Sequence, residues 1–219
     1  MLNCAHAEAK GAQTGIGIVK LMGLHSGFIA AGATLASQEV NFTLIPEVPL
    51  VLDGKKGFLN VLRDRLLDRH HAVVVVAEGV GQDLLPVADS TSDASGNPSL
   101  TDIGLFLKQQ IKAYFAEQEI QTSVKDIDPS YIIRSVPANA EDCLLCDQFA
   151  RAAVHAAMAG KIDMVVGLWN DQFMHVNIEM ATKETQRVRR IKKQAIVLQD
   201  EVLINISTPD IKTRGTFSY

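Results

Sequence analysis

The sequence predicts an α/β fold in which helices cover both faces of a mainly parallel sheet, giving three Rossmann-like layers. Two observations carry this prediction. Residues 72–77 are Ala-Val-Val-Val-Val-Ala, and a run that is apolar at every position is typical of an interior strand whose two sides are both covered. Predicted strands also alternate along the chain with amphipathic helices, which is the order expected of βαβ units.

Composition and charge narrow the class of protein. The chain has 219 residues, of which 47% are hydrophobic and 21% charged, so it has enough apolar surface to offset the entropy lost on folding. The net charge of −4 does not favour nucleic acid as a partner. No apolar run reaches the ~18 residues of a membrane span, and none follows Met1 as in a secretory signal. We therefore expect a cytoplasmic protein with neither a membrane nor a nucleic-acid partner.

The first part of the chain predicts elements with definite ends. Residues 1–12 favour a helix that lacks an N-cap signal. Residues 15–22 form a β-branched run that begins at glycine and favours a strand, and Ser26 is placed to cap a helix over 27–37. Two further elements precede the valine-rich strand, namely a short strand over 41–45 and a helix over 56–70.

The rest of the chain continues this alternation. Residues 86–100 are rich in Ser, Asp, Gly and Pro and predict a loop. Beyond it, periodicity predicts helices over 101–117 and 141–159 and strands over 120–127 and 163–168. Ligands of parallel sheets bind beyond the carboxyl ends of the strands, so the residues that follow the strands are the candidates for function.

The cysteines do not indicate a disulfide scaffold, because there are only three of them. Cys143 and Cys146 lie one turn apart on the helix expected over 141–159. No second pair is present to complete a tetrahedral zinc site. Two small buried hydrophobic side chains explain this pair better than a redox or zinc function, and we expect no metal site.

Two turns after strands carry candidate ligand-binding groups. Met22, Gly23 and Leu24 lead from the first strand into a helix, where glycine lets the backbone approach an anion, although a tight turn without a ligand explains the same residues. Glu78 ends the valine-rich strand. Its carboxylate is either an acceptor for sugar hydroxyls or an exposed turn residue.

The third candidate group follows the strand expected over 120–127. Tyr131 and Arg134 lie three residues apart, so within a turn of helix their side chains can face the same way. The rigid guanidinium of arginine suits phosphate, and tyrosine adds a hydroxyl. A surface arginine beside a half-buried tyrosine is the simpler alternative, and Lys125 lies just upstream.

Taken in order, these segments are more specific than any one of them. The chain resembles the later part of a 6-phosphofructokinase of the plant, protist and bacterial type, which includes ATP-dependent and pyrophosphate-dependent enzymes. The resemblance covers residues 3–185 and rests on GIGIVKLMGLHSGFIAAGATLAS, NFTLIPE, VVVVAEGVGQDLL, DIDPSYIIRSVPANAEDCLLC and AVHAAMAGKIDMVVGLW. Its most specific motifs are Met-Gly-x-x-Ser-Gly and Pro-Ser-Tyr-x-x-Arg.

The resemblance implies an activity in glycolysis, phosphoryl transfer to the 1-hydroxyl of fructose 6-phosphate from ATP with Mg²⁺ or from pyrophosphate. It implies that the Met22-Gly23-Leu24 turn contacts the sugar phosphate and that Glu78 binds sugar hydroxyls. It implies that Tyr131 and Arg134 hold the 6-phosphate. Lys125, six positions before Tyr131, matches a basic residue that contributes to the phosphate site, often across a subunit boundary.

The sequence departs from the family pattern in two respects. Leu24 stands where the family's Met-Gly-Arg turn has arginine. The family's catalytic aspartate, in a Thr-Ile-Asp-Asn-Asp segment, and its Gly-Gly-Asp nucleotide or pyrophosphate turn both precede the region that resembles residues 1–12. The resemblance therefore assigns no catalytic residue to this chain and little of the donor site. We expect no kinase activity from the isolated chain, and the choice between ATP and pyrophosphate stays open.

The resemblance also implies the phosphofructokinase fold, here as one lobe plus an incomplete part of the second. We expect a sugar-phosphate-binding lobe over 1–135, a segment of the nucleotide or pyrophosphate lobe over 136–175, and a C-terminal return segment and tail over 176–219. The strand over 163–168 is then expected to be an unpaired apolar edge, open to another chain.

Three functions follow from this resemblance. The first is a truncated 6-phosphofructokinase chain that keeps part of the fructose 6-phosphate site. The second is a non-catalytic sugar-phosphate-binding or regulatory subunit that pairs with a full-length phosphofructokinase. The third is a divergent sugar-phosphate sensor. Association with identical copies is compatible with each of them.

Overall fold

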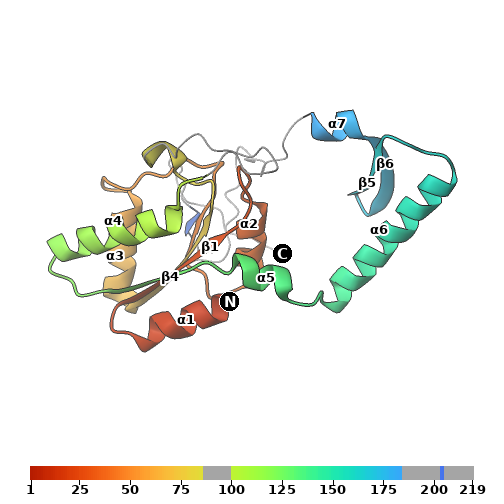
Figure 1. The fold of residues 1–219 in the computed structure, drawn as a ribbon. Coiled ribbons are helices and arrows are strands. Elements are labelled where there is room, and N and C mark those ends of the chain that lie inside the picture. The colour runs from red at the N-terminus through yellow and green to blue at the C-terminus, as the bar shows by residue number, and fades with distance from the viewer. Residues whose placement is uncertain (86–99, 184–202, 205–219) are drawn as a thin grey trace, which may run out of the picture. The chain divides into compact units, whose positions relative to one another are not determined.

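The computed structural model describes residues 1–85, 100–183 and 203–204, and these form two compact units (Figure 1). The first unit contains Met1–Ser130, and the second begins at Tyr131. Much of the loop predicted over 86–100 and of the return segment predicted over 176–219 lies outside the described residues.

The first unit is built on a five-stranded sheet with the order β4-β1-β3-β2-β7, in which every neighbouring pair is parallel. Its strands are β1 (Gly15–Leu21), β2 (Phe42–Leu44), β3 (His71–Ala77), β4 (Ser123–Ile127) and β7 (Leu203–Ile204). The valine-rich strand β3 lies between β1 and β2 and is buried from Ala72 to Ala77. This confirms the prediction of an interior parallel strand.

Helices cover both faces of the sheet, so the three-layer α/β prediction is confirmed (Figure 1). One face carries α1 (Leu2–Gly11) and α2 (Phe28–Ala36), and the other carries α3 (Phe58–Arg69) and α4 (Ile103–Glu117). A short 3₁₀ turn, η1 (Gln82–Leu84), follows β3. The apolar stripes of α3 and α4 complete the core with Phe58, Leu62, Leu66, Ile103, Leu107, Ile111 and Phe115, all of them buried.

Helix α1 docks on the sheet through small residues, because its buried positions are Ala5 and Ala9. A Cβ atom added to Gly15 would lie 2.1 Å from the carbonyl oxygen of Ala9, and one added to Gly17 would lie 3.0 Å from that of Ala5. Only glycine therefore lets the backbones of α1 and β1 approach this closely.

The structure corrects the predicted start of α2. Ser26 does not cap this helix, because the N-cap residue is Gly27 and the helix begins at Phe28. The backbone N–H of Gly27 donates to both carboxylate oxygens of Glu47, at 3.0 and 3.1 Å. A carboxylate from a distant turn thus takes the place of the serine hydroxyl at this helix end.

The second unit contains α6 (Ala140–Met158), β5 (Met164–Trp169), β6 (Gln172–Asn177) and α7 (Ile178–Thr182). The prediction of an unpaired strand over 163–168 is wrong, because β5 pairs antiparallel with β6. The connection is a two-residue turn in which Asn170 and Asp171 both have positive φ, 47° and 58°. Positive φ at both positions is the requirement of a hairpin turn that matches strand twist, and Asn and Asp tolerate it.

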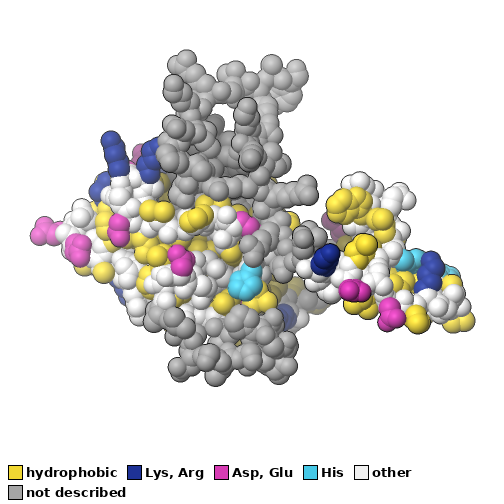
Figure 2. Space-filling model, turned by 90° about the horizontal axis from the view of Figure 1, so that it is seen from above, with side chains coloured by type: hydrophobic (Ala, Val, Ile, Leu, Met, Phe, Trp, Pro, Cys, Tyr) yellow, Lys and Arg dark blue, Asp and Glu magenta, His cyan; other side chains and the backbone are white. Residues whose placement is uncertain are grey.

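The second unit buries little of its apolar surface within itself. Among its described residues only Ala156 is a buried hydrophobic residue, whereas Tyr131, Trp169 and Met180 are exposed. Figure 2 shows hydrophobic side chains at the surface of this unit. Cys143 and Cys146 are also exposed, so the expectation of two buried thiols is wrong.

The described helices were also compared with the requirements of a bilayer. None of them is both long enough and apolar enough to span a membrane.

Candidate functional site

The parallel sheet brings two of the predicted turns together. β1 and β3 are neighbours in register, with Leu21 opposite Ala77, so both strands end at the same edge of the sheet. The turn that starts at Met22 follows β1, and Glu78 follows β3. The carboxyl edge of such a sheet is where ligands bind in this fold class.

The turn after β1 has an unusual backbone that the sequence specifies in part. Gly23 has φ of 148° and Leu24 has φ of 48°. Ser26 donates its backbone N–H to the carbonyl oxygen of Gly23 at 2.8 Å, which closes the turn. A Cβ at position 23 would lie 2.3 Å from the Ser26 carbonyl oxygen, so glycine is required there. Leucine in a left-handed conformation costs about 1–2 kcal/mol, which the contacts of the turn must offset.

Glu78 supplies those contacts. Its Oε1 atom accepts hydrogen bonds from the backbone N–H groups of Gly23 at 3.0 Å and Leu24 at 2.7 Å. A Cβ atom on Gly79 would lie 1.8 Å from the Leu24 carbonyl oxygen, so the two turns interlock at van der Waals distance. Two N–H groups that converge on one carboxylate oxygen fix its position and stabilise its negative charge. Glu78 is half-buried and keeps Oε2 for a further donor.

Ser26 adds a polar atom beside this turn. Its Oγ is buried and has no hydrogen-bond partner among the residues that the structure describes. The sequence analysis assigned Ser26 to the helix cap, a position that Gly27 takes.

Lys125 is not brought to the Glu78 turn within the first unit. It lies in the middle of β4 opposite Gly17, and its Nζ atom is 3.4 Å from Glu8 Oε1 on α1. Both side chains are about half exposed, at 54% and 56%, so this ion pair contributes little to stability.

Tyr131 and Arg134 belong to α5 (Ser130–Ser135), which begins at the last residue of the first unit. Both side chains are exposed, and Tyr131 is 84% exposed. A spacing of three residues on a helix places them on the same face, as predicted. The tyrosine is therefore an accessible side chain and not the half-buried one that the simpler alternative described.

A group of charged residues that the sequence analysis missed lies near the same edge of the sheet. Lys20, near the end of β1, forms ion pairs with Asp102 Oδ2 at 2.9 Å and Asp128 Oδ2 at 3.0 Å. Burial acts to lower the pKa of Lys20, but the hydrogen bonds to both carboxylates outweigh it and hold this pKa above its usual value. The sequence offered one signal for this group, because Asp128 directly precedes the Pro-Ser-Tyr motif. Its partner Lys20 is distant in sequence, so the ion pair could not be predicted.

Asp126 interacts with the same group of charged residues, but its pKa is raised, whereas that of Asp102 is lowered. Its Oδ1 atom is buried without a hydrogen-bond partner among the described residues. Burial first and the charge of Asp102 second raise the pKa of Asp126. In contrast, burial also acts to raise the pKa of Asp102, but the hydrogen bonds from Lys20 and from the backbone N–H groups of Leu105 and Gly104, together with the charge of Lys20, outweigh it, and the pKa of Asp102 is lowered.

The described residues contain no group of three or more His, Cys, Asp or Glu side chains that could hold a metal ion.

Known proteins share much of this sequence. The family model described as Phosphofructokinase matches residues 1–157. The chain is 48% identical over 190 residues to the ATP-dependent 6-phosphofructokinase of Borreliella burgdorferi, covering 84% of this chain and 42% of that protein. It is 45% identical over 192 residues to the chloroplastic ATP-dependent 6-phosphofructokinase 4 of Arabidopsis thaliana, covering 86% of this chain and 36% of that protein. The chain thus spans about two fifths of these relatives.

Solved structures show the same fold. A pyrophosphate-dependent phosphofructokinase from Marinobacter aquaeolei matches with a TM-score of 0.62 and 20% identity, covering 86% of this chain and 46% of the other. Phosphofructokinase from Saccharomyces cerevisiae matches with a TM-score of 0.59 and 23% identity, covering 84% of this chain and 22% of the other.

Proposed function

This chain belongs to the phosphofructokinase family, and on that premise we propose that it carries part of the fructose 6-phosphate site of a 6-phosphofructokinase. The observation that carries the proposal is the hydrogen-bonded pair of turns in which Glu78 binds the backbone of Gly23 and Leu24. Met22, Gly23 and Glu78 match the family pattern, whereas Leu24 departs from it, and the turn and the carboxylate lie together at the carboxyl edge of the sheet.

In this proposal each residue has a separate task. Glu78 accepts hydrogen bonds from sugar hydroxyls through its free oxygen, while the two backbone N–H groups hold it in place. Arg134 binds the 6-phosphate with its guanidinium fork, and Tyr131 adds a hydroxyl hydrogen bond. The backbone of the Met22–Leu24 turn lies against the sugar. Lys125, which lies in the middle of β4 away from this turn, would add a positive charge for the phosphate only across a subunit boundary.

The relatives favour ATP with Mg²⁺ as the phosphoryl donor of the family member to which this chain corresponds, since the proteins at 45–48% identity are named ATP-dependent. The neighbours named pyrophosphate-dependent are 18–20% identical and support the fold alone. The donor set present does not fit a metal–nucleotide site, because the described residues contain no group of metal ligands and Lys20 already holds Asp102 and Asp128.

We therefore infer that the 219-residue chain binds the sugar phosphate but does not transfer a phosphoryl group by itself. Leu24 places an aliphatic side chain where the family has an arginine, and an oriented charge donor at a phosphoryl-transfer site contributes roughly 3–4 kcal/mol to the transition state. The division into a sugar-phosphate lobe over 1–135, a segment of the second lobe over 136–175 and a return segment over 176–219 belongs to this proposal, as does a cytoplasmic location.

Two measurements test it. Isothermal titration of the purified chain with fructose 6-phosphate should give saturable binding, and fructose, which lacks the phosphate, should bind far more weakly. A coupled assay with ATP or pyrophosphate should detect no fructose 1,6-bisphosphate. Absence of fructose 6-phosphate binding would overturn the site, and product formation would overturn the inactivity of the isolated chain.

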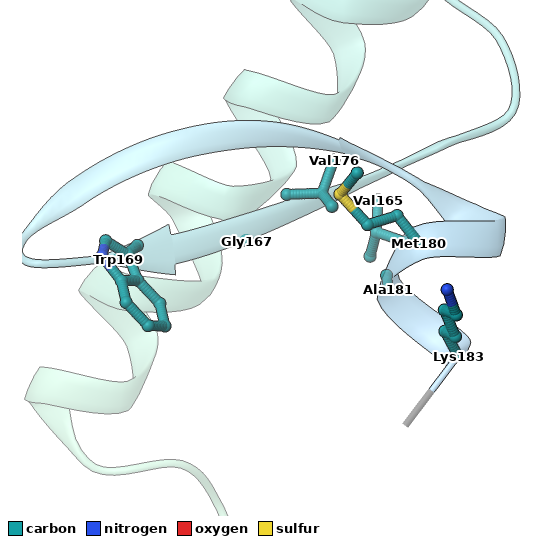
Figure 3. Close-up of a pocket in the computed structure, with 7 residues that line it drawn as sticks. All are labelled: Val165, Gly167, Trp169, Val176, Met180, Ala181 and Lys183. Atoms are coloured by element: carbon teal, nitrogen blue, oxygen red, sulfur yellow. The ribbon is translucent and has the colours of Figure 1, made fainter. Parts of the chain in front are cut away.

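One observation favours the alternative of a non-catalytic subunit that pairs with a full-length phosphofructokinase. A groove of about 400 Å³ runs along one face of the β5–β6 hairpin, lined by Val165, Gly167, Trp169, Val176, Met180, Ala181 and Lys183 (Figure 3). α6 packs against the other face of the hairpin. There the rings of Phe149 and Phe173 lie edge to face, with their centroids 5.0 Å apart. An exposed apolar face of this kind is typical of an interaction surface. Co-purification with a full-length relative, and its loss on Trp169→Ser, would support pairing.

A further inference from the structure

We propose that Lys20 is a positioning residue for the sugar-phosphate site, because it fixes the start of the helix that carries Tyr131 and Arg134. This inference rests on the proposed function, in which those two side chains bind the 6-phosphate. Lys20 itself is not expected to touch the sugar.

The contacts of Lys20 are specific. Its side chain is only 16% exposed, and its Nζ atom bridges Asp102 at 2.9 Å and Asp128 at 3.0 Å. Asp102 in turn caps α4, since its Oδ1 atom accepts from the backbone N–H groups of Gly104 at 2.9 Å and Leu105 at 3.2 Å. Lys20 is thus held from one side by a helix that is packed on the sheet.

The other contact reaches α5. Asp128 uses Oδ2 for Lys20 and Oδ1 for the backbone N–H of Ser130, at 3.1 Å. Ser130 is the first residue of α5, and Tyr131 follows it directly. One carboxylate therefore joins the end of β1 to the first turn of the helix.

This junction matters because α5 is a short helix of six residues that buries none of them. Helices this short are not stable alone, so the geometry of the first turn depends on the groups that bind it. When Lys20 loses its charge, Asp128 loses its cation and no longer holds the N–H of Ser130 in a fixed direction.

A set of variants tests the inference in the whole chain. Lys20→Met removes the charge at similar length, Lys20→Arg keeps the charge, and Lys112→Met is the control at an exposed position of α4. Amide hydrogen exchange of residues 130–135 reports on the start of α5 without any ligand. Titration with fructose 6-phosphate reports on binding, and thermal unfolding reports on global stability.

We expect Lys20→Met to speed exchange in residues 130–135 and to weaken fructose 6-phosphate binding by about tenfold, the loss of one charge-assisted hydrogen bond. Lys20→Arg should restore most of both, and Lys112→Met should change neither. In a double-mutant cycle, Lys20→Met should cost less affinity in an Arg134→Met background than in the wild type, because part of its effect passes through Arg134.

Additive losses in the cycle, or unchanged exchange in residues 130–135, would overturn the inference and leave Lys20 with a purely structural role. If the wild-type chain binds no fructose 6-phosphate, the proposed function fails, and so does the link from Lys20 to the phosphate. The exchange measurement then decides alone whether Lys20 holds the start of α5.

Discussion

Leu24 donates its backbone N–H to Glu78 Oε1 at 2.7 Å, although the two residues are 54 positions apart in the chain. The contact exists because β1 and β3 are parallel neighbours that end at the same edge. Leu24 is the position at which the chain departs from the family turn, whereas Glu78 matches the family pattern. The backbone at position 24 thus makes this contact with Glu78 while its side chain differs from the arginine of the family turn.

The first prediction concerns Glu78 and the stability of the turn. Glu78→Ala leaves the half-buried N–H groups of Gly23 and Leu24 without their acceptor, and the loss of these hydrogen bonds should lower the unfolding free energy by about 1–3 kcal/mol. Glu78→Gln keeps an acceptor oxygen and should lose less. Urea denaturation measures both, with Glu117→Ala on the exposed end of α4 as the matched control. Equal losses for Glu78→Ala and the control would contradict the contact.

The second prediction compares two glycines. A Cβ atom at Gly79 would lie 1.8 Å from the Leu24 carbonyl oxygen, so Gly79→Ala must force the interlocked turns apart, at a cost of about 2 kcal/mol or more. Gly32 lies inside α2 with nothing within 4 Å of its added Cβ, so Gly32→Ala should stabilise the protein by roughly 0.5–1 kcal/mol. Thermal unfolding distinguishes the two, and a stabilising Gly79→Ala would refute the geometry.

The third prediction uses the raised pKa of Asp126, which follows from burial and from the nearby charge of Asp102. A carboxyl whose pKa is higher in the folded than in the unfolded state costs stability above that folded pKa, and the cost disappears as pH falls below the unfolded pKa. Asp126→Asn should therefore raise the unfolding free energy at pH 7 and change it little at pH 3.

Asp102 and Asp128 provide the comparison for Asp126, because their pKa values shift in the opposite direction. The pKa values of Asp102 and Asp128 are lowered, because hydrogen bonds, including those from Lys20, outweigh burial, which acts to raise them. Their contribution is present above their unfolded pKa and is lost as pH falls through the folded pKa, which is the opposite sign to Asp126. Asp102→Asn should therefore destabilise the protein at pH 7. Stabilisation by both substitutions would contradict this assignment of partners.

The fourth prediction separates binding from folding at Tyr131. Its side chain is 84% exposed, so Tyr131→Phe should change the unfolding free energy by less than about 0.5 kcal/mol. Loss of the hydroxyl should nevertheless weaken fructose 6-phosphate binding by roughly 3–10-fold, the value of one hydrogen bond. Ile132→Ala, beside it on α5, serves as the control. An unchanged affinity would remove Tyr131 from the site.

Strong periodicity made the first unit predictable from sequence. The apolar run of β3 predicts an interior strand, and the apolar stripes of α3 and α4 predict helices that pack on the sheet. The structure buries all three in this way. Long-range polar contacts could not be predicted in this way. Nothing local to Gly27 indicates that Glu47 would take its N–H, and nothing local to Lys20 indicates that it would bridge Asp102 and Asp128.

The second unit shows where a motif was present and missed. The Asn170-Asp171 pair predicts a two-residue hairpin turn, but the resemblance led to the expectation of an unpaired apolar edge strand over 163–168. The exposed thiols of Cys143 and Cys146 were also mispredicted, since helix periodicity says which residues share a face and not whether that face is covered.

The proposed sugar-phosphate site is tested most directly at the turn that Glu78 holds. The measurement is a titration of the ¹⁵N-labelled chain with fructose 6-phosphate, followed by the amide signals of the protein. We expect the signals of Gly23 and Leu24 to shift along one saturation curve. Shifts confined to residues outside this turn, or no saturable shift at all, would contradict the proposed site.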